Sequence, residues 1–205
     1  MNNLRIQWIA VTLVFVGLFV AVNCSATELS PGGSVELHGA TAASSPSLKG
    51  TVLADRIIDF QLRDQEGKLV FIGTLQDRVV RSSKTGKLCF YHRIRSMEPR
   101  LSGAIASVVK SGYAHFRADV DYRLDGLGAI PPVLATRSES GEQIRFIFAR
   151  GKGDYPGPEG QPIGAGDESR FFFIQTDDRG YELNGNTTIF GTDGSHLTLR
   201  TFAPR

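Results

Sequence analysis

The chain has 205 residues, and its 23 basic and 21 acidic side chains give a formal net charge of +2 at pH 7. This near-neutral balance gives no electrostatic reason to expect nucleic acid or an acidic membrane surface as a partner. The length suits about one domain, which can bury a core without disulfide bonds. The sequence holds two cysteines, Cys24 and Cys89.

The N-terminus has the order of a signal peptide. Arg5 precedes an apolar stretch at residues 6–22, and small residues follow it. This order predicts that residues 1–26 are a signal peptide cleaved after Ala26, so the protein is expected to be secreted, periplasmic or on the cell surface. Two alternatives stay open, an uncleaved membrane anchor and a lipoprotein acylated at Cys24. We expect no other contact with a membrane.

Residues 27–49 are rich in Ser, Ala, Gly and Pro, which predicts a linker or a loosely held first strand. From Gly50 onward the hydrophobic period is two, which is typical of β-strands. The long run at 68–81 follows this period until Val79 and Val80 break the phase. Such a break predicts a bulge or a bend in the strand.

Further strands follow along the chain. The run at 87–95 closes a hairpin with the one before it, and 105–109 is either a short strand or a helical turn. Residues 115–125 alternate most cleanly, which predicts a half-buried strand with a charged outer face. Residues 133–138 and 143–149 form a second predicted hairpin.

The segment 151–166 is dense in Gly and Pro and is predicted to be a long loop, where binding could reside. Four successive apolar residues at 171–174 predict a strand buried on both faces. The remaining strands are expected at 170–176, 187–190 and 197–202. About seven to nine strands without an amphipathic helix predict an antiparallel β-sandwich over residues 50–205, with a β-barrel as the alternative.

The strand region carries five short motifs: QDRVVR at 76–81, LCFYHRI at 88–94, DVDYRLDGLG at 119–128, SRFFFI at 169–174 and TFAP at 201–204. Over residues 51–204 they resemble a pattern in bacterial exported proteins of unknown function, some of which end in a sorting anchor of the PEP-CTERM type. The resemblance implies a bacterial extracytoplasmic domain and implies no activity. No apolar helix follows Pro204, so we do not expect that anchor here.

Acidic side chains in one strand phase are candidate ligands for a metal ion. The three acids are Asp119, Asp121 and Asp125. Side chains two apart in a strand could share a hard cation such as calcium. The arginines between them favour a solvated face with ion pairs instead, and the order of the acids differs from that of a calcium-binding loop. The sequence therefore predicts no cofactor and leaves calcium open as an alternative.

Loop tyrosines are the candidate ligand-binding residues. Tyr113, Tyr155 and Tyr181 fall in predicted loops. Exposed aromatic rings on the loops of a sandwich could form a platform for sugar rings if they cluster. The same residues are also ordinary in loops, so their clustering is what decides between the two interpretations.

Signals for catalysis are missing from the sequence. It contains no Gly-x-Ser-x-Gly elbow and no His-Glu-x-x-His motif. His92 falls in the inward phase of its strand, which favours a core or hairpin-edge histidine bonded to backbone. Cys89, interpreted as a small buried residue, is three positions away and faces the other side, so the two cannot form a dyad.

Three hypotheses of function remain. The first is a non-enzymatic exported β-sandwich that serves in surface structure or binds a protein partner. The second is a module that binds carbohydrate or another small ligand. A hydrolase whose groups come from distant loops is the third, since no motif supports it.

Overall fold

A computed structural model of the chain describes residues 26–149 and 159–205. In these residues it contains twelve β-strands and one short 3-10 helix, η1 (Pro46–Leu48). No helix in the described part is long and apolar enough to cross a membrane. The predicted signal peptide up to Ser25, including Cys24, lies outside the described residues, and so does Tyr155.

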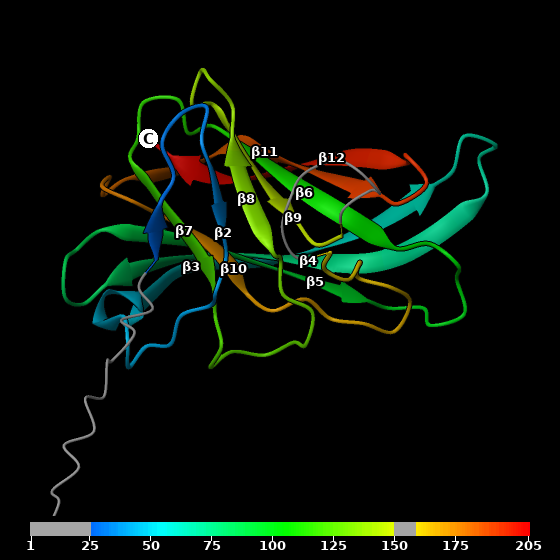
Figure 1. Cartoon of the computed structure of the whole chain (residues 1–205), viewed down its shortest axis with the longest axis horizontal. Helices are drawn as coiled ribbons and strands as arrows, with labels where there is room; N and C mark the ends of the chain where they lie inside the picture. The colour runs from blue at the N-terminus through cyan, green and yellow to red at the C-terminus, as the bar shows by residue number, and fades with distance from the viewer. Residues whose placement is uncertain (1–25, 150–158) are drawn as a thin grey trace, which may run out of the picture.

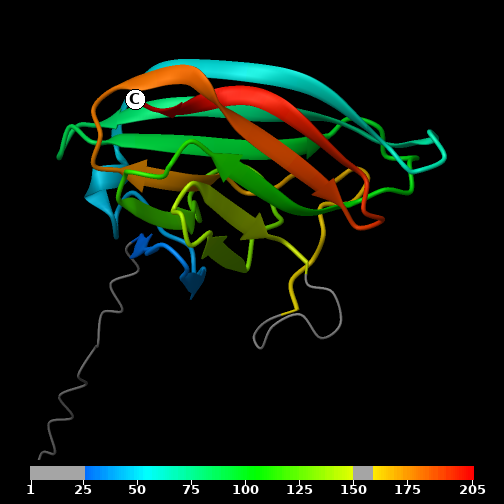
Figure 2. The ribbon, with the colours of Figure 1, turned by 90° about the horizontal axis from the view of Figure 1, so that it is seen from above.

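The strands form two antiparallel sheets of six strands each, and neither sheet closes on itself (Figures 1 and 2). The order in the first sheet is β1 (Thr27–Glu28), β7 (Ala118–Tyr122), β10 (Phe172–Thr176), β5 (Leu88–Ser96), β4 (Leu69–Ser82) and β3 (Gly50–Arg63). The order in the second sheet is β12 (His196–Pro204), β11 (Tyr181–Gly191), β6 (Ile105–Ser111), β9 (Gln143–Ile147), β8 (Leu134–Arg137) and β2 (Ser34–Glu36). The predicted antiparallel β-sandwich is confirmed.

Local turn chemistry sets the register of the longest hairpin, β3–β4. The carboxylate of Asp64 accepts hydrogen bonds from the backbone N–H groups of Glu66 and Lys68, at 3.0 and 2.9 Å. Gly67 follows with φ of 82°, a conformation that glycine adopts without steric cost. The turn therefore reverses the chain over few residues and leaves both strands long.

The main core lies between the two sheets and is built from aromatic and aliphatic side chains. Phe172 is fully buried at its centre, with its ring 4.8 Å from that of Phe146 and 5.5 Å from that of Phe148. In β5, Leu88 and Phe90 point into this core. The inward phase predicted for β5 is therefore confirmed.

A second apolar cluster lies on the outer face of the first sheet. Its members are Ala40, Leu48, Val80, Cys89, Tyr91, Phe171 and Phe173. Successive side chains of a strand point to opposite faces, so these residues point away from the second sheet. Residues 37–49, here called the strap, supply Ala40 and Leu48 and cover part of this face.

The strap is held mainly by backbone bonds to β7 and the residues after it. The N–H of Ala40 donates to the carbonyl of Tyr122 at 2.8 Å, and the N–H of Leu124 donates to the carbonyl of Ala40 at 2.9 Å. Residues 27–49, expected to be a linker or a loose first strand, thus supply β1, β2 and the strap. These residues include few apolar side chains, so their composition does not indicate that they form strands and a packed segment.

The phase break at Val79 and Val80 has a different origin from the predicted bulge in their own strand. Val79 is buried between the sheets and Val80 is buried under the strap. Both phases are therefore apolar because both faces of β4 are covered. The register shift at this level lies in β3, between Val52 and Ala54.

Other expectations of the sequence are refined in the same way. The undecided segment 105–109 is strand β6, and the second hairpin is confirmed as β8–β9. The run at 171–174 is buried on both faces as predicted. In β7 the expected solvated face is partly covered, since Asp121 is only 2% exposed beneath the strap. Twelve strands exceed the expected number partly because β1 and β2 are too short to carry a period.

Candidate functional site

The part of the first sheet's outer face that the strap leaves open is rich in arginine. We call it the arginine face, and it consists of Arg78, Arg93, Arg95 and Arg123 with the residues between them. Arg78 and Arg93 lie over the ring of Phe171, with guanidinium carbons 5.3 and 4.7 Å from the ring centre. Such cation–π contacts fix the two side chains side by side on a buried aromatic base.

Carboxylates hold each arginine in place. Arg78 pairs with Asp55 at 2.6 Å. Glu168 lies 2.8 Å from Arg93 and 3.3 Å from Arg95. The pairs of Arg78 and Arg95 are partly exposed, so they contribute little to stability and mainly orient the guanidinium groups, whereas Arg93 itself is buried. The face is therefore charged, ordered and open to solvent.

The first of two hollows on the face is a cleft of about 430 Å³ at the border of the strap. It is lined by Leu48, Gly50, Arg78, Val80, Tyr91, Arg123, Asp125, Gly126, Leu127 and Phe171. Leu127 is 62% exposed, so the cleft also offers apolar surface to a ligand. We call it the strap cleft.

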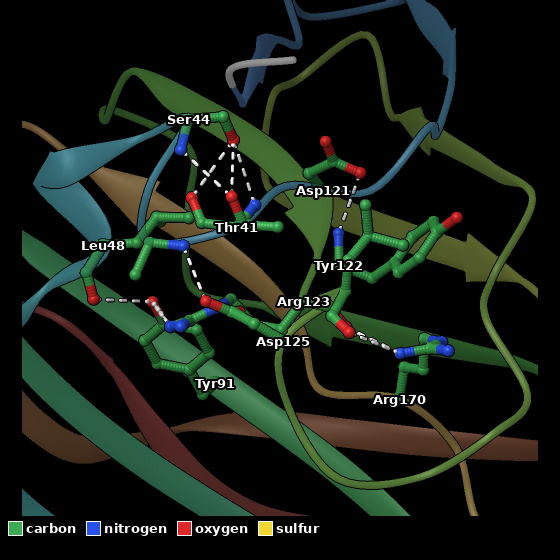
Figure 3. A network of polar contacts seen from close by, with 11 residues as sticks. Thr41, Ser44, Leu48, Tyr91, Asp121, Tyr122, Arg123, Asp125 and Arg170 are labelled. Atoms are coloured by element: carbon green, nitrogen blue, oxygen red, sulfur yellow. Dashed lines mark hydrogen bonds and ion pairs between the residues drawn. The ribbon is translucent and has the colours of Figure 1, made fainter.

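A hydrogen-bond network ties the base of the strap cleft to the strap (Figure 3). Arg123 donates through Nε to Asp125 at 2.7 Å and through Nη1 to the hydroxyl of Tyr91 at 3.3 Å. The Tyr91 hydroxyl donates to the carbonyl of Leu48, and Asp125 accepts from the N–H of Ala42. The hydrogen bond from Arg123 lowers the pKa of Asp125, and burial raises the pKa of Tyr91. At neutral pH the cleft therefore holds a guanidinium, a carboxylate and a neutral phenol.

The second hollow is a cleft of about 290 Å³ lined by Ile57, Asp59, Thr74, Gln76, Arg93, Arg95 and Met97. Gln76 donates through Nε2 to Asp55 at 2.8 Å, while its buried Oε1 accepts no hydrogen bond within the described structure. An unpaired buried acceptor costs about 1–3 kcal/mol. The buried Oε1 of Gln76 is out of reach of solvent, so the second cleft offers a ligand mainly the half-exposed guanidinium of Arg95.

The two clefts are neighbours on one surface. Arg78 lines the strap cleft and Gln76 lines the second cleft, and both are on β4. Tyr91 and Arg93 have the same relation on β5. Residues two apart in a strand stand about 7 Å apart on the same face. The clefts are thus spaced for adjoining parts of one extended ligand.

Comparison of the chain with known protein families, with curated proteins and with solved structures found no match. The arginine face and its two clefts are therefore the features of this chain that bear on its function.

The predicted tyrosine platform is distributed differently. Tyr113 is fully buried, with its ring edge-on to Phe90 in the main core. Tyr181 begins β11, and its hydroxyl donates to the carbonyl of Leu53 at 3.3 Å. The structure therefore does not bring these two rings together on the surface, and Tyr155 lies outside the described residues.

The three acids of the predicted metal site have separate partners. Asp121 accepts hydrogen bonds from the N–H groups of Gly39 and Tyr122 at 2.8 and 2.9 Å, and burial raises its pKa. Asp125 binds the strap and Arg123, as described above. Asp119 lies 3.4 Å from Arg117, and burial raises its pKa too. Within residues 26–149 and 159–205, no three His, Cys, Asp or Glu side chains are grouped to hold a metal ion.

Sequence reasoning missed the arginine face. Arg93 and Arg95 are two apart in one predicted strand, which places them on a shared face. Arg78 and Phe171 join them only through the pairing of β4 with β5 and of β5 with β10. The pairing of strands is a long-range property of the fold. The sequence pattern could therefore place Arg93 and Arg95 together but could not place Arg78 and Phe171 beside them.

Proposed function

We propose that this protein is a non-enzymatic extracytoplasmic binding module that holds an acidic carbohydrate, one bearing carboxylate groups, on the arginine face. The observation that supports it is the pair of adjacent clefts, each lined by arginine and each with polar and apolar surface. An expected signal peptide and the resemblance to exported proteins support the location outside the cytoplasm.

The chemistry of the clefts favours this ligand class. A guanidinium group binds a carboxylate through two parallel N–H donors, and a fixed guanidinium does so at little entropic cost. Arg123 uses two of its five donors on Asp125 and Tyr91, so donors remain for a ligand. Leu127, which is exposed beside the strap cleft, packs against the C–H face of a sugar ring.

The charge of the face decides between an acidic and a neutral sugar. A neutral sugar would leave the arginines with only their present carboxylate partners. The guanidinium groups keep N–H donors that their present carboxylate partners do not use, and hydrogen bonds from these donors to a ligand carboxylate are about twice as strong as neutral ones. We therefore expect a uronic acid oligomer to bind more tightly than a neutral oligomer of equal length.

Titration calorimetry of the purified protein with oligogalacturonate, and with a neutral oligosaccharide of equal length, tests the proposal. The wild type should bind the uronate, and Arg123→Gln should weaken binding about tenfold or more, which is one lost charge-assisted contact. Arg200→Gln is the matched control, because Arg200 is exposed on β12 and donates to Leu183 instead. Equal binding of the two oligomers, or no binding of either, would refute the proposal.

A protein partner is the second candidate, supported by one observation. Strand β3 is one of the two edges of the first sheet, and it exposes Ile57 by 69%. Asp55 and Asp59 flank Ile57, and the register shift near Val52 distorts the edge. Charges and bulges on an edge oppose the addition of another strand, which is why this candidate ranks second. A dimer in solution that Ile57→Lys dissociates would favour it.

A further inference from the structure

A charged cluster lies inside the sandwich, away from the arginine face. Asp77 on β4, His92 on β5 and Lys110 on β6 are each fully buried. The first two come from the first sheet and Lys110 comes from the second (Figure 1). The Nζ atom of Lys110 lies 4.0 Å from Oδ1 of Asp77, and Nδ1 of His92 lies 3.3 Å from the same oxygen.

Two threonines hold the Nζ atom of Lys110, and its remaining bonding position is free to face Asp77. Its Nζ donates to the hydroxyl oxygens of Thr187 and Thr201, both at 2.8 Å. A neutral amine has two N–H bonds and one lone pair in tetrahedral positions. When the two threonines take the N–H bonds, the lone pair is left for Asp77.

The aspartate has unequal oxygen atoms. Its Oδ2 accepts the backbone N–H of Phe202 at 2.8 Å. Its Oδ1 is buried and accepts no hydrogen bond within the described structure. Oδ2 of the carboxyl group therefore has a hydrogen-bond donor and Oδ1 has none among the described residues. Oδ1 is also the oxygen that faces Lys110 and His92.

Burial makes the separated charges costly. Removing an ion from water costs several kcal/mol even after the protein relaxes, and an ion pair regains this only with good geometry. Burial lowers the pKa of Lys110 to about 8, so the neutral amine is accessible near physiological pH. Burial alone would raise the pKa of Asp77, but His92 and the charge of Lys110 bring it below its usual value. Neutralising Lys110 removes one of the groups that keep Asp77 ionised.

We propose that Lys110 and Asp77 condense into an isopeptide bond that joins the two sheets covalently. A proton first passes from the ammonium group of Lys110 to Oδ1 of Asp77, which gives a neutral amine and a neutral carboxyl group. The Nζ lone pair then attacks Cγ of that carboxyl group, and a C–N bond forms. The Cγ–Oδ1 bond then breaks, and Oδ1 leaves with two protons as water. The step exchanges a carboxyl and an amine for an amide and water, so no oxidant, reductant or co-reactant is needed.

The neighbours of the pair suit this reaction. His92 lies next to Oδ1, where it takes a proton from the amine and returns it to the departing oxygen. The N–H of Phe202 stabilises the negative charge that develops on Oδ2. The product has no buried charge and no unpaired Oδ1, and the surrounding core excludes the water needed for hydrolysis.

The bond would connect the sheets where no disulfide can. Cys89 is the single cysteine among the described residues, and it faces the strap. Strand β4 and strand β6 belong to opposite sheets, so their linkage resists separation of the two layers. Like a disulfide, such a crosslink restricts the unfolded chain and raises resistance to unfolding.

Peptide mass spectrometry of the purified protein tests the proposal. Tryptic cleavage after Lys110 is blocked if its amine is acylated. We expect a branched peptide joining 69–78 to 101–117, lighter by one water than the sum of its parts. Recovery of the unlinked peptide 101–110 in full yield, or a water loss located elsewhere, would overturn the proposal.

Variants separate the bond from other causes of a mass change. Lys110→Met keeps all but the last atom of the side chain's length, has no amine, and should abolish the branched peptide. His92→Gln should slow its formation, measured by intact mass in samples taken during refolding from denaturant. A branched peptide that persists in Lys110→Met would contradict the assignment. If a variant does not fold, the wild-type peptide map still decides.

Discussion

Protonation of His92 should make the protein acid-labile. The ring is fully buried, and burial lowers its pKa from 6.5 to about 4, with the charge of Lys110 acting in the same direction. Asp77 opposes this shift but is outweighed. Burial is the largest cause and acts whether or not the isopeptide bond has formed.

The sign and size follow from linkage. Below pH 6.5 the unfolded chain binds a proton at His92 that the folded chain does not bind until about pH 4. The free energy of unfolding therefore falls as the pH falls through this window and levels off below it. A shift of this size corresponds to about 3 kcal/mol over the whole window and about 2 kcal/mol by pH 5.

Urea denaturation at pH 7 and at pH 5 measures the effect. Asp125 also has a lowered pKa and adds acid lability of its own, mainly at lower pH, and so does Asp77 in molecules where it has not condensed with Lys110. His92→Gln cannot titrate at this position, so it should lose about 2 kcal/mol less than the wild type between the two pH values. His196→Gln, at an exposed position, should behave like the wild type. Equal losses in the wild type and His92→Gln would refute the reasoning.

Two further predictions concern buried groups elsewhere. Burial raises the pKa of Cys89 to about 12, so a thiol reagent at pH 8 should leave it unmodified in the folded protein and react after unfolding. Rapid reaction in native buffer would contradict this. Arg137 is 6% exposed and donates to the backbone carbonyls of Leu29, Tyr113, Phe116 and Gly141. Arg137→Met removes these four hydrogen bonds, and within the described residues only the carbonyl of Tyr113 keeps a further donor, the N–H of Phe116. The variant should lower the free energy of unfolding by about 3 kcal/mol or more, and a loss within about 1 kcal/mol would refute that role.

The hydrophobic period of two predicts most of the strands of the fold. It separated Phe90, which points into the main core, from Cys89, which points to the outer face. It failed where both faces of a strand are covered, as at Val79 and Val80. Apolar and polar residues alternate only in a strand that has one solvent-exposed face and one buried face. A strand that is buried on both faces is apolar throughout and shows no alternation.

The strap could not be recognised from its composition. It contributes small apolar side chains and is fixed by backbone groups such as the N–H of Ala40. Backbone bonding leaves almost no trace in the amino-acid sequence. The acids that accept the strap's N–H groups, Asp121 and Asp125, were visible but were interpreted as ion-pairing or metal-binding residues.

The charged cluster in the core had a signal that went unused. Val108 and Lys110 share one phase of β6, and Val108 is fully buried in the main core. A lysine in an apolar phase is rare enough to predict a buried partner. The sequence leaves 105–109 open between a short strand and a helical turn, so it assigns no inward or outward phase to Lys110. Its partner Asp77 lies on the other sheet and is distant in the sequence, so the two residues come together only in the folded protein.

The strap and the strap cleft depend on each other. Leu48 lines the cleft, and Asp125 accepts from Ala42 in the strap while it holds Arg123 in the cleft. Undocking the strap would therefore remove one wall and release the arginine that is expected to bind the ligand. By linkage, a ligand that requires the docked strap must stabilise its docking by the same free energy. Hydrogen exchange at the N–H of Ala40 should accordingly slow when ligand occupies the cleft.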